Sequence, residues 1–300
     1  MMYMNGSVRR KILFYIGLIF LTIFMILLIF DLTRRGVYDG KMGLNIAVIG
    51  DSKVSFLLLR PDEGMVGWVD LPNNTKIMIF NSTASYPVGS VWNYGVSVKS
   101  PYSVIEKSLG QAMGVTIARS MKLDREVNVE NVLSELLSIT LKTDLSFKDR
   151  FLIRAFLAES VKSKKIIEYS LPSSVFDIVT EPDGEEFREI NSTMALWTKN
   201  KFVFEPILDE NVDVSVNNVS SIPGLANVLS KQLESAGVRV IEVKGDKTDN
   251  IYDHGCVYVV VGKYEFTEKL LSEHLDCKKG TAPNGMTAED GVKIYINDQL

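Results

Sequence analysis

The sequence predicts a mixed α/β (α+β) protein in which two modules follow an N-terminal transmembrane helix. Three observations support this prediction. The nineteen residues 12–30 contain no charged side chain. Short apolar runs alternate with amphipathic helical stretches over 44–207, which is typical of an α/β module. The remaining chain, 208–300, orders its elements β-α-β-β-α-β, which predicts a second, smaller module.

We expect the transmembrane helix at 12–32, as an uncleaved signal anchor. At about 1.5 Å per residue the uncharged run spans about 28 Å, close to the hydrocarbon thickness of a bilayer. Three basic residues precede it at 9–11, which favours a cytoplasmic tail at 1–11 and export of the rest. A cleaved signal peptide is the alternative. Its apolar core runs only about 7–15 residues and ends at small residues, whereas Asp31 follows here, and we expect 33–43 to be a linker.

The segment 44–207 predicts alternating strands and helices. We expect strands at 45–51, 54–59, 65–69, 76–80 and 115–123, and helices at 102–113, 129–139 and 147–163. Gly114 is placed to end the first helix, and Asn128 and Ser146 to cap the second and third. The stretch 168–210 has many turn residues and several aromatics, so it closes the module without a clear pattern of elements.

The tail has the clearest pattern in the chain. Valines at 212, 214 and 216 alternate with polar residues, which predicts a strand with one buried face. A loop at 217–224 and a helix at 225–236 follow. We then expect strands at 238–243, 256–261 and 292–296 and a second helix at 265–274. This order is that of a split βαβ, ferredoxin-like sandwich with its helices on one face of the sheet.

Composition restricts the partners and the metals. The formal net charge is −4, and nucleic acid usually selects a basic surface, so we expect no nucleic-acid partner. The only cysteines and histidines are Cys256, Cys277, His254 and His274, and no pair has a metal-ligand spacing such as C-x-x-C. Core thiols and surface imidazoles are the favoured interpretation. A Cys256–Cys277 disulfide stays open if the domain is exported.

Three short motifs in the tail occur in a recognisable order. They are Asp213-Val214-Ser215-Val216-Asn217-Asn218, then Pro223-Gly224-Leu225-Ala226, then Ala236-Gly237-Val238-Arg239-Val240. Together they resemble the C-terminal domain of LytR-type proteins, which has a strand ending in an Asn-rich turn, a Gly-Leu-Ala helix start and a small-Gly-hydrophobic strand entry. The resemblance continues through 259–263 and covers about the last third of the chain.

The middle of the chain also contains several partial sequence motifs, again in a recognisable order. They are Gly50-Asp51-Ser52, Asp70-Leu71-Pro72-Asn73-Asn74-Thr75, Asn93-Tyr94-Gly95 and Thr143-Asp144-Leu145 followed by Arg150. In this order they resemble a LytR-CpsA-Psr domain that has lost much of its motif. The resemblance implies enzymes that move a polymer from a polyprenyl-pyrophosphate carrier to the cell wall, usually with a divalent cation.

The departures from that family concern the charges. Asn73 stands where the family has arginine, Asn74 where it has aspartate, and Phe147 where it has the first of two arginines. Losing one preorganised charge stabiliser commonly costs about 10²–10³ in rate. We therefore expect no catalytic residue, no metal site and no cofactor, with Mg²⁺ required only if the chain is an enzyme.

Two sets of polar residues remain as candidate ligand sites. Asp51, Arg60, Asp144 and Arg150 form a candidate residual pocket; the alternative, which we favour, is that Asp51 caps a turn and the others lie on a solvated surface. The second set is the loop of Asn217, Asn218, Ser220, Ser221 and Gly224, which could bind an anion or a sugar hydroxyl. The same residues also suit an ordinary turn with a Ser221 cap and Pro223 in the first helical turn, which we favour.

The favoured function is that of a non-catalytic, membrane-anchored cell-envelope protein. It would scaffold or recognise cell-wall polymer or its assembly machinery. We expect a single-pass protein of the cell membrane with its bulk outside the cytoplasm, and cell-wall glycan or envelope proteins as partners. A phosphotransferase that attaches polyprenyl-pyrophosphate-linked glycopolymer to the wall is one alternative. A structural partner in a membrane protein complex is the other.

Overall fold

The computed structural model describes residues 12–19, 21–22, 25, 36–51, 53–245, 254–281 and 291–298. The described residues of the expected anchor, between 12 and 25, are helical and exposed. None of the helices in the described part of the chain is long and apolar enough to cross a bilayer. The tail expected at 1–11 and much of the span expected at 12–32 lie outside the described residues.

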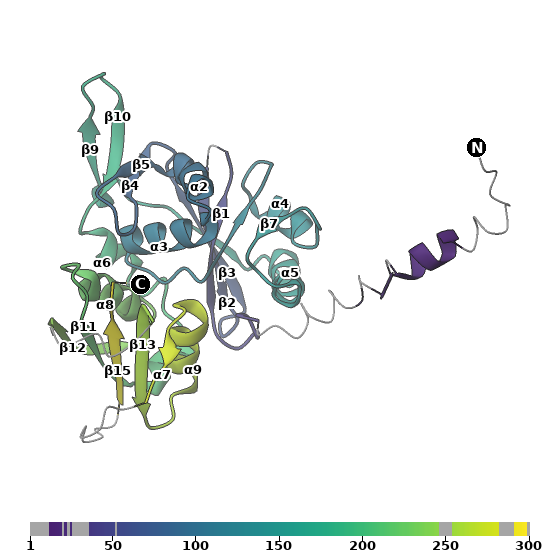
Figure 1. Ribbon diagram of the computed structural model, residues 1–300. Helices are drawn as coiled ribbons and strands as arrows, with labels where there is room; N and C mark the ends of the chain where they lie inside the picture. The colour runs from purple at the N-terminus through teal and green to yellow at the C-terminus, as the bar shows by residue number, and fades with distance from the viewer. Residues whose placement is uncertain are drawn as a thin grey trace, which may run out of the picture.

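A six-stranded sheet forms the centre of the first module (Figure 1). Its strand order is β7-β6-β1-β2-β3-β8. Strand β1 pairs antiparallel with β2 and parallel with β6, and β3 pairs antiparallel with β2 and parallel with β8. The bounds are β1 Leu44–Ile49, β2 Val54–Arg60, β3 Met65–Leu71, β6 Arg119–Lys122, β7 Lys142–Thr143 and β8 Ile166–Tyr169.

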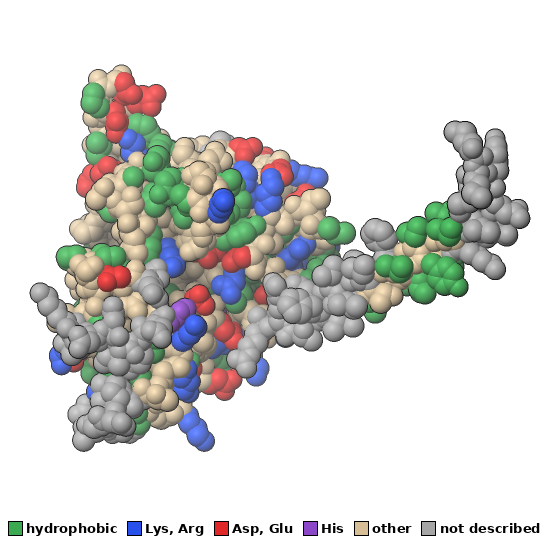
Figure 2. Space-filling model, viewed as in Figure 1, with side chains coloured by type: hydrophobic (Ala, Val, Ile, Leu, Met, Phe, Trp, Pro, Cys, Tyr) green, Lys and Arg blue, Asp and Glu red, His purple; other side chains and the backbone are tan. Residues whose placement is uncertain are grey.

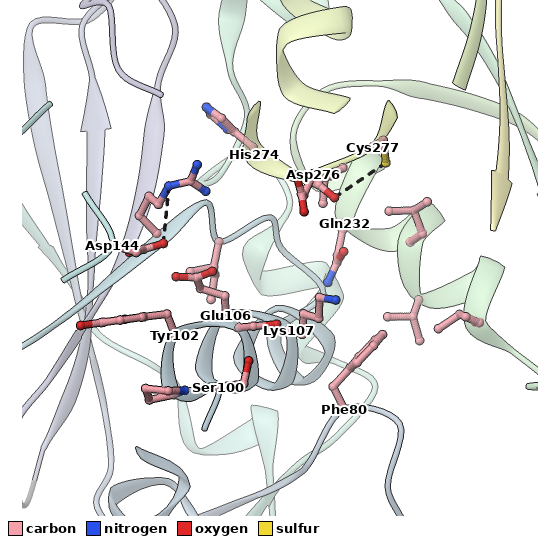
Figure 3. A pocket seen from close by; sticks show the side chains of 18 of the residues that line it. Phe80, Ser100, Tyr102, Glu106, Lys107, Asp144, Gln232, His274, Asp276 and Cys277 are labelled. Atoms are coloured by element: carbon pink, nitrogen blue, oxygen red, sulfur yellow. Dashed lines mark hydrogen bonds and ion pairs between the residues drawn. The ribbon is translucent and has the colours of Figure 1, made fainter. Parts of the chain in front are cut away.

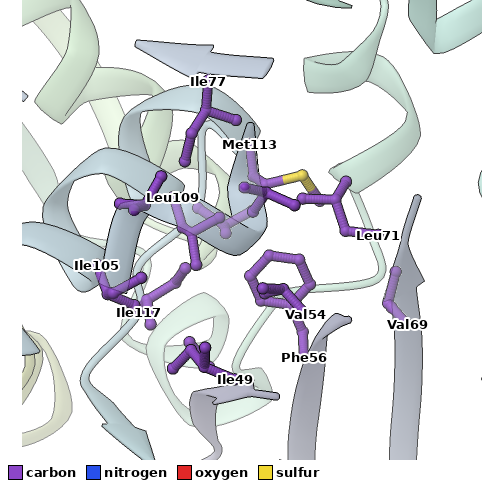
Figure 4. Close-up of a cluster of buried hydrophobic side chains, with 14 of the residues drawn as sticks. Ile49, Val54, Phe56, Val69, Leu71, Ile77, Ile105, Leu109, Met113 and Ile117 are labelled. Atoms are coloured by element: carbon purple, nitrogen blue, oxygen red, sulfur yellow. The ribbon is translucent and has the colours of Figure 1, made fainter. Parts of the chain in front are cut away.

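Helices cover both faces of this sheet, which explains why every residue of β1 and β2 is buried and most of them are apolar. Ala47 and Ile49 point into the core under α2 (Val88–Ser97) and α3 (Pro101–Met113), where Figure 4 shows Ile49 and Phe56 facing Leu109 and Met113. The intervening Ile46 and Val48 point into the opposite core. That second core lies under α4 (Val129–Glu135) and α5 (Phe147–Lys162).

The three residues expected to end or cap helices are found in those positions. Helix α3 ends at Gly114, whose φ of 66° suits glycine. The Asn128 side chain accepts a hydrogen bond from the Asn131 amide at the start of α4, and the Ser146 side chain accepts one from the Asp149 amide at the start of α5. Helix α4 is shorter than expected, because it ends before the turns at 136–139.

A smaller sheet extends the first module. Its strand order is β5-β4-β10-β9. The hairpin of β9 and β10 projects from the body in Figure 1, and acidic side chains gather at its end in Figure 2. Of these strands only β4 was expected, as the strand at 76–80. The bounds are β4 Thr75–Met78, β5 Ser85–Pro87, η1 Ser173–Val175, β9 Phe176–Thr180, β10 Glu186–Ile190, α6 Met194–Thr198 and α7 Glu205–Glu210.

The second module follows the expected order of elements, but its strands are arranged differently. Strand order is β12-β11-β15-β13-β14. Because β11 pairs parallel with β12, joined by α8, the first βαβ unit is not split, and the ferredoxin-like arrangement is wrong. The bounds are β11 Asp213–Asn218, α8 Leu225–Ser235, β12 Arg239–Gly245, β13 Cys256–Val261, α9 Glu265–Lys269, the π-helical turn η2 Leu270–His274, β14 Lys278–Lys279 and β15 Gly291–Ile296.

A disulfide joins Cys256 in β13 to Cys277 just before β14, with 4.6 Å between their Cα atoms. Both cysteines are buried in the core of the second module. The pairing that the sequence left open is therefore present in the structure.

The segment expected to be a linker, 33–43, is packed over its described part. Val37 and Tyr38 are buried in the core of the first module under α5, and Met42 is buried in the core of the second. The Tyr38 amide donates a hydrogen bond to Asp149 Oδ1 at 2.9 Å, and Asp39 Oδ2 lies 2.5 Å from Lys269 Nζ. The described part of this segment therefore makes contacts with both modules.

Candidate functional site

A pocket of about 550 Å³ lies where the two modules meet. Helix α3 and strand β6 supply its first-module side, and α8 together with 274–277 supplies the other (Figure 3). Its lining residues are Phe80, Lys99, Ser100, Pro101, Tyr102, Ser103, Glu106, Lys107, Ile117, Arg119, Asp144, Leu225, Val228, Leu229, Gln232, His274, Leu275, Asp276 and Cys277. A junction between modules is a common place for a ligand site.

Two carboxyl groups meet in this pocket. Glu106 comes from α3, and Asp144 follows β7. Ser120 lies between them: its hydroxyl donates to Glu106 Oε1 at 2.8 Å, and its amide donates to Asp144 Oδ1 at 3.0 Å. Arg119 Nε lies 3.5 Å from Asp144 Oδ2. The polar network therefore joins a helix, a strand and the loop before α5.

The pKa values of both carboxyl groups are raised. Burial raises the pKa of Glu106 well above its ordinary value, and the negative charge of Asp144 raises it further. Burial also raises the pKa of Asp144, although the Ser120 amide and Arg119 oppose this shift. Because Asp144 has these two donors, Glu106 is the carboxyl of the pair that is more readily protonated.

The rest of the pocket is partly apolar. Leu225, Val228 and Leu229 of α8 form one wall. Lys107 Nζ lies 5.5 Å from the centre of the Phe80 ring, and burial lowers the pKa of that lysine. Hydroxyl and amide groups add hydrogen-bond donors and acceptors; they come from Ser100, Tyr102, Ser103 and Gln232.

His274 closes the junction between the modules. Its side chain is 5% exposed and its ring stands edge-on to Phe204 at 5.8 Å between centroids. Burial, followed by the charges of Arg119 and Lys269, lowers the pKa of His274 to about 3. The imidazole is therefore neutral at physiological pH.

The carboxyl pair does not fit a divalent cation. In the part of the chain that the structure describes, no three histidine, cysteine or acidic side chains converge as a metal site. Within this pair, the pKa of Glu106 is raised well above its ordinary value and Asp144 already contacts Arg119. A cation would have to lie beside that guanidinium, which is electrostatically unfavourable.

Three of the four residues in the expected residual pocket lie elsewhere. Asp51 has an 85% exposed side chain, and its Oδ1 lies 2.5 Å from Lys122 Nζ. The Lys122 ammonium lowers the pKa of Asp51. Arg150 donates through Nε to Leu136 O at 2.6 Å, which ties α5 to the end of α4.

Arg60 is buried rather than placed in a pocket. It is 2% exposed, and burial lowers the pKa of its guanidinium to about 10. The guanidinium donates to Asn45 Oδ1 and Lys201 O, each at 3.1 Å, and lies 5.1 Å from the Phe204 ring centroid. Only Asp144 of the four lines the pocket, so the candidate cluster of Asp51, Arg60, Asp144 and Arg150 is not formed, and the favoured placement of Arg60 on a solvated surface is also wrong.

The candidate loop at 217–224 uses its polar groups internally. Asn218 Oδ1 accepts hydrogen bonds from the Ser220 amide at 3.0 Å and hydroxyl at 2.6 Å. The Ser221 amide and hydroxyl both donate to Asp298 Oδ1, at 2.6 and 2.8 Å. The expected Ser221 cap is therefore wrong, because Gly224, with φ of 84°, holds the N-cap position of α8. Asn217 Nδ2 donates weakly to Ile294 O at 3.4 Å.

Sequence reasoning missed Glu106 and Arg119. Glu106 stands beside Ile105 on a helix whose apolar face was evident, and nothing local distinguishes it from a solvated acid. Its role depends on Asp144, which is thirty-eight residues further along the chain. Only the packing of α3 against β6 and β7 brings the two together.

Fold and pocket together define a mixed α/β protein of two packed modules with a ligand-sized cavity at their junction. No family model matches the sequence, and no curated protein matches it. Among solved structures, the chain is similar to TagT and TagV of B. subtilis and to a transcriptional regulator from Enterococcus faecalis.

These likenesses are distant. For TagT the identity is 10% over 54% of this chain and 89% of that chain, with a TM-score of 0.39. For TagV the identity is 9% over 66% and 98%, with a TM-score of 0.41. For the E. faecalis regulator the identity is 10% over 66% and 88%, with a TM-score of 0.41. The activity of the present chain therefore has to be argued from its own residues.

Proposed function

We propose that the chain is a divergent, non-catalytic LytR-CpsA-Psr protein with a LytR-type C-terminal domain. It is tethered to the membrane and binds a polyhydroxylated segment of cell-wall glycan in the junction pocket. One observation carries the proposal: the lining of the pocket balances basic against acidic side chains. Lys99, Lys107 and Arg119 stand with Glu106, Asp144 and Asp276, and Arg119 Nε lies 3.5 Å from Asp144 Oδ2.

This balance does not suit a pyrophosphate. Several phosphoryl charges need several cations with donors aimed at them. Arg119 is engaged by Asp144, acidic side chains also stand in the lining beside Lys99 and Lys107, and the positions that departed from the family motif add no cation. Asn73 and Asn74 are exposed at the start of β4, and Phe147 lies at the start of α5, so none of them lines the pocket.

The same balance suits sugar hydroxyl groups. A hydroxyl both donates and accepts, and the pocket offers both kinds of partner in the Asp144 carboxylate, the Gln232 amide and the Tyr102 hydroxyl. The apolar wall from α8 can receive the C–H face of a sugar ring. Cys256–Cys277 supports an exported site, since disulfides persist in oxidising compartments.

The test is a binding measurement on the full chain in detergent. Soluble cell-wall glycan fragments are titrated by calorimetry, in parallel with a polyprenyl pyrophosphate plus Mg²⁺. We expect saturable glycan binding that Asp144→Asn weakens about tenfold, because a charge-assisted hydrogen bond contributes about 1.5–3 kcal/mol. Asp51→Asn is the matched control, since Asp51 lies outside the pocket and is largely exposed.

The opposite result identifies the enzyme alternative. Saturable, Mg²⁺-dependent binding of the pyrophosphate, without glycan binding, would contradict a non-catalytic receptor. Absence of both would leave the structural-partner alternative as the better account.

A further inference from the structure

Helix α5 exposes aromatic side chains among basic ones. Phe151 is 59% exposed and Phe147, one turn earlier, is 38% exposed. Lys148, Arg154 and Lys162 are exposed around them. Among the described residues these three cations form no ion pair. A solvated helix face normally lacks aromatic residues, so this combination points to a partner surface.

The apolar part continues beyond the helix. Ile139, in the turn after α4, is 93% exposed. Arg150 holds that turn against α5, because it donates to Leu136 O at 2.6 Å and its guanidinium lies 5.5 Å from the Phe147 ring centroid. Ile139 and the two phenylalanines therefore belong to neighbouring parts of one face.

Helix α5 and the three residues after it are positively charged, whereas the whole chain is negatively charged. Residues 147–165 contain six basic and two acidic side chains, whereas the chain carries a formal net charge of −4. One of the two acids, Asp149, is buried and bonded to the Tyr38 amide. A basic surface with exposed aromatic rings complements anionic lipid headgroups over an apolar boundary.

The position of α5 in the chain also favours a lipid membrane as the partner. The hydrogen bond from Tyr38 to Asp149 fixes the incoming chain at the first turn of α5. The uncharged run of the expected anchor ends at residue 30, and the eight residues from there to Tyr38 reach at most about 29 Å when extended. The start of α5 therefore lies within about 30 Å of the membrane surface, a step that rests on the tether in the proposed function.

We propose that this face is a membrane-docking surface for anionic lipid. We call it the α5 surface and define it by Ile139, Phe147, Lys148, Phe151, Arg154 and Lys162. The aromatic rings and Ile139 enter the interfacial layer while the basic side chains contact headgroup phosphates. Docking holds the body against the bilayer in one orientation, which a single tether could not do.

The experiment uses the full chain reconstituted into vesicles of phosphatidylcholine, with or without phosphatidylglycerol. An environment-sensitive fluorophore is attached at Ala155→Cys, an exposed position on the α5 face, or at Asp183→Cys near the tip of the β9–β10 hairpin as control. The native cysteines are joined in a disulfide and do not compete for the label. Vesicle flotation reports the tether, and quenching by spin-labelled lipid reports docking.

We expect strong quenching at residue 155 in anionic vesicles, less in neutral vesicles or high salt, and little at residue 183. The double variant Phe147→Ser/Phe151→Ser should float with the vesicles but lose the quenching at 155. Quenching that is absent at 155, equal at 183, or unchanged in the double variant overturns the docking surface and leaves the tether intact. A chain that does not float with the vesicles overturns both.

Discussion

Arg60 is a buried cation whose partners come from three parts of the chain. It donates to the carbonyl of its neighbour Leu59 at 2.8 Å, to Asn45 in β1 and to the Lys201 carbonyl before the second module. Phe204 lies against the guanidinium and belongs to the core of the second module. A planar group with several donors satisfies these acceptors together, which a lysine could not do.

Replacing Arg60 should therefore destabilise the whole chain. We expect Arg60→Met to lower the free energy of unfolding by about 2–4 kcal/mol, because buried acceptors lose their donors. Arg60→Lys should recover little of the loss. Chemical denaturation followed by fluorescence measures both variants, with the exposed Lys199→Ala as control. A change below about 0.5 kcal/mol in Arg60→Met would show that the buried contacts are dispensable.

Glu106 makes stability depend on pH in a defined direction. Its pKa is raised in the folded protein, so between its ordinary value near 4.5 and the raised value the unfolded chain is ionised while the folded chain stays protonated. Unfolding then releases a proton, and stability falls as pH rises through that window. The stabilising contribution is complete below the ordinary pKa.

Glu106→Gln should remove this dependence, because the amide is neutral at every pH. We expect the variant and the parent to differ little near pH 4, and the variant to gain relative stability as pH rises to 8. Thermal unfolding at a series of pH values measures the difference, with Glu130→Gln on the exposed side of α4 as control. A difference that stays constant with pH would mean that Glu106 is ionised in the folded state.

At the scale of elements, the sequence predicted best those segments whose signals are local. Caps and stops at Gly114, Asn128 and Ser146 fixed three helix ends, and the doubly buried β1 and β2 were evident as apolar runs. The hairpin of β9 and β10 was missed because its exposed residues break any alternation. Helix α2 was missed because its glycines and valines resemble a turn.

Other features depend on contacts between distant segments. The order of elements in the tail was correct, but element order does not determine which strands become neighbours, so the ferredoxin-like topology failed at β11 and β12. In the site, Asp144 was identified, whereas Glu106 and Arg119 acquire their roles only through packing. Arg60 was expected either on a solvated surface or in a ligand pocket, because the sequence gives no sign that a guanidinium will be buried.

The disulfide is the element-scale feature that can be removed most cleanly. It closes a loop between residues 21 positions apart, connecting β13 to the strand β14 that pairs with it. Reduction, or the double variant Cys256→Ala/Cys277→Ala, should lower the free energy of unfolding by about 3 kcal/mol. Calorimetry with and without reductant measures this change. Identical transitions under both conditions would contradict a structural role for the bond.

For the molecule as a whole, the junction between the two modules is the feature on which the proposed function depends. The pocket needs α3 from one module and α8 from the other, so neither half alone can form it. His274 and Phe204 fill the same junction with an uncharged contact. Ligand binding there would stabilise the arrangement of the two modules, since a ligand that binds only the assembled state favours that state.

The packed stretch at 36–43 has a mechanical consequence. A force applied on the N-terminal side reaches the first module through the Tyr38–Asp149 hydrogen bond. It reaches the second module through the Asp39–Lys269 ion pair, so both modules bear the load. In the proposed function, tension on a glycan bound in the pocket would be transmitted to the N-terminal side through these same contacts.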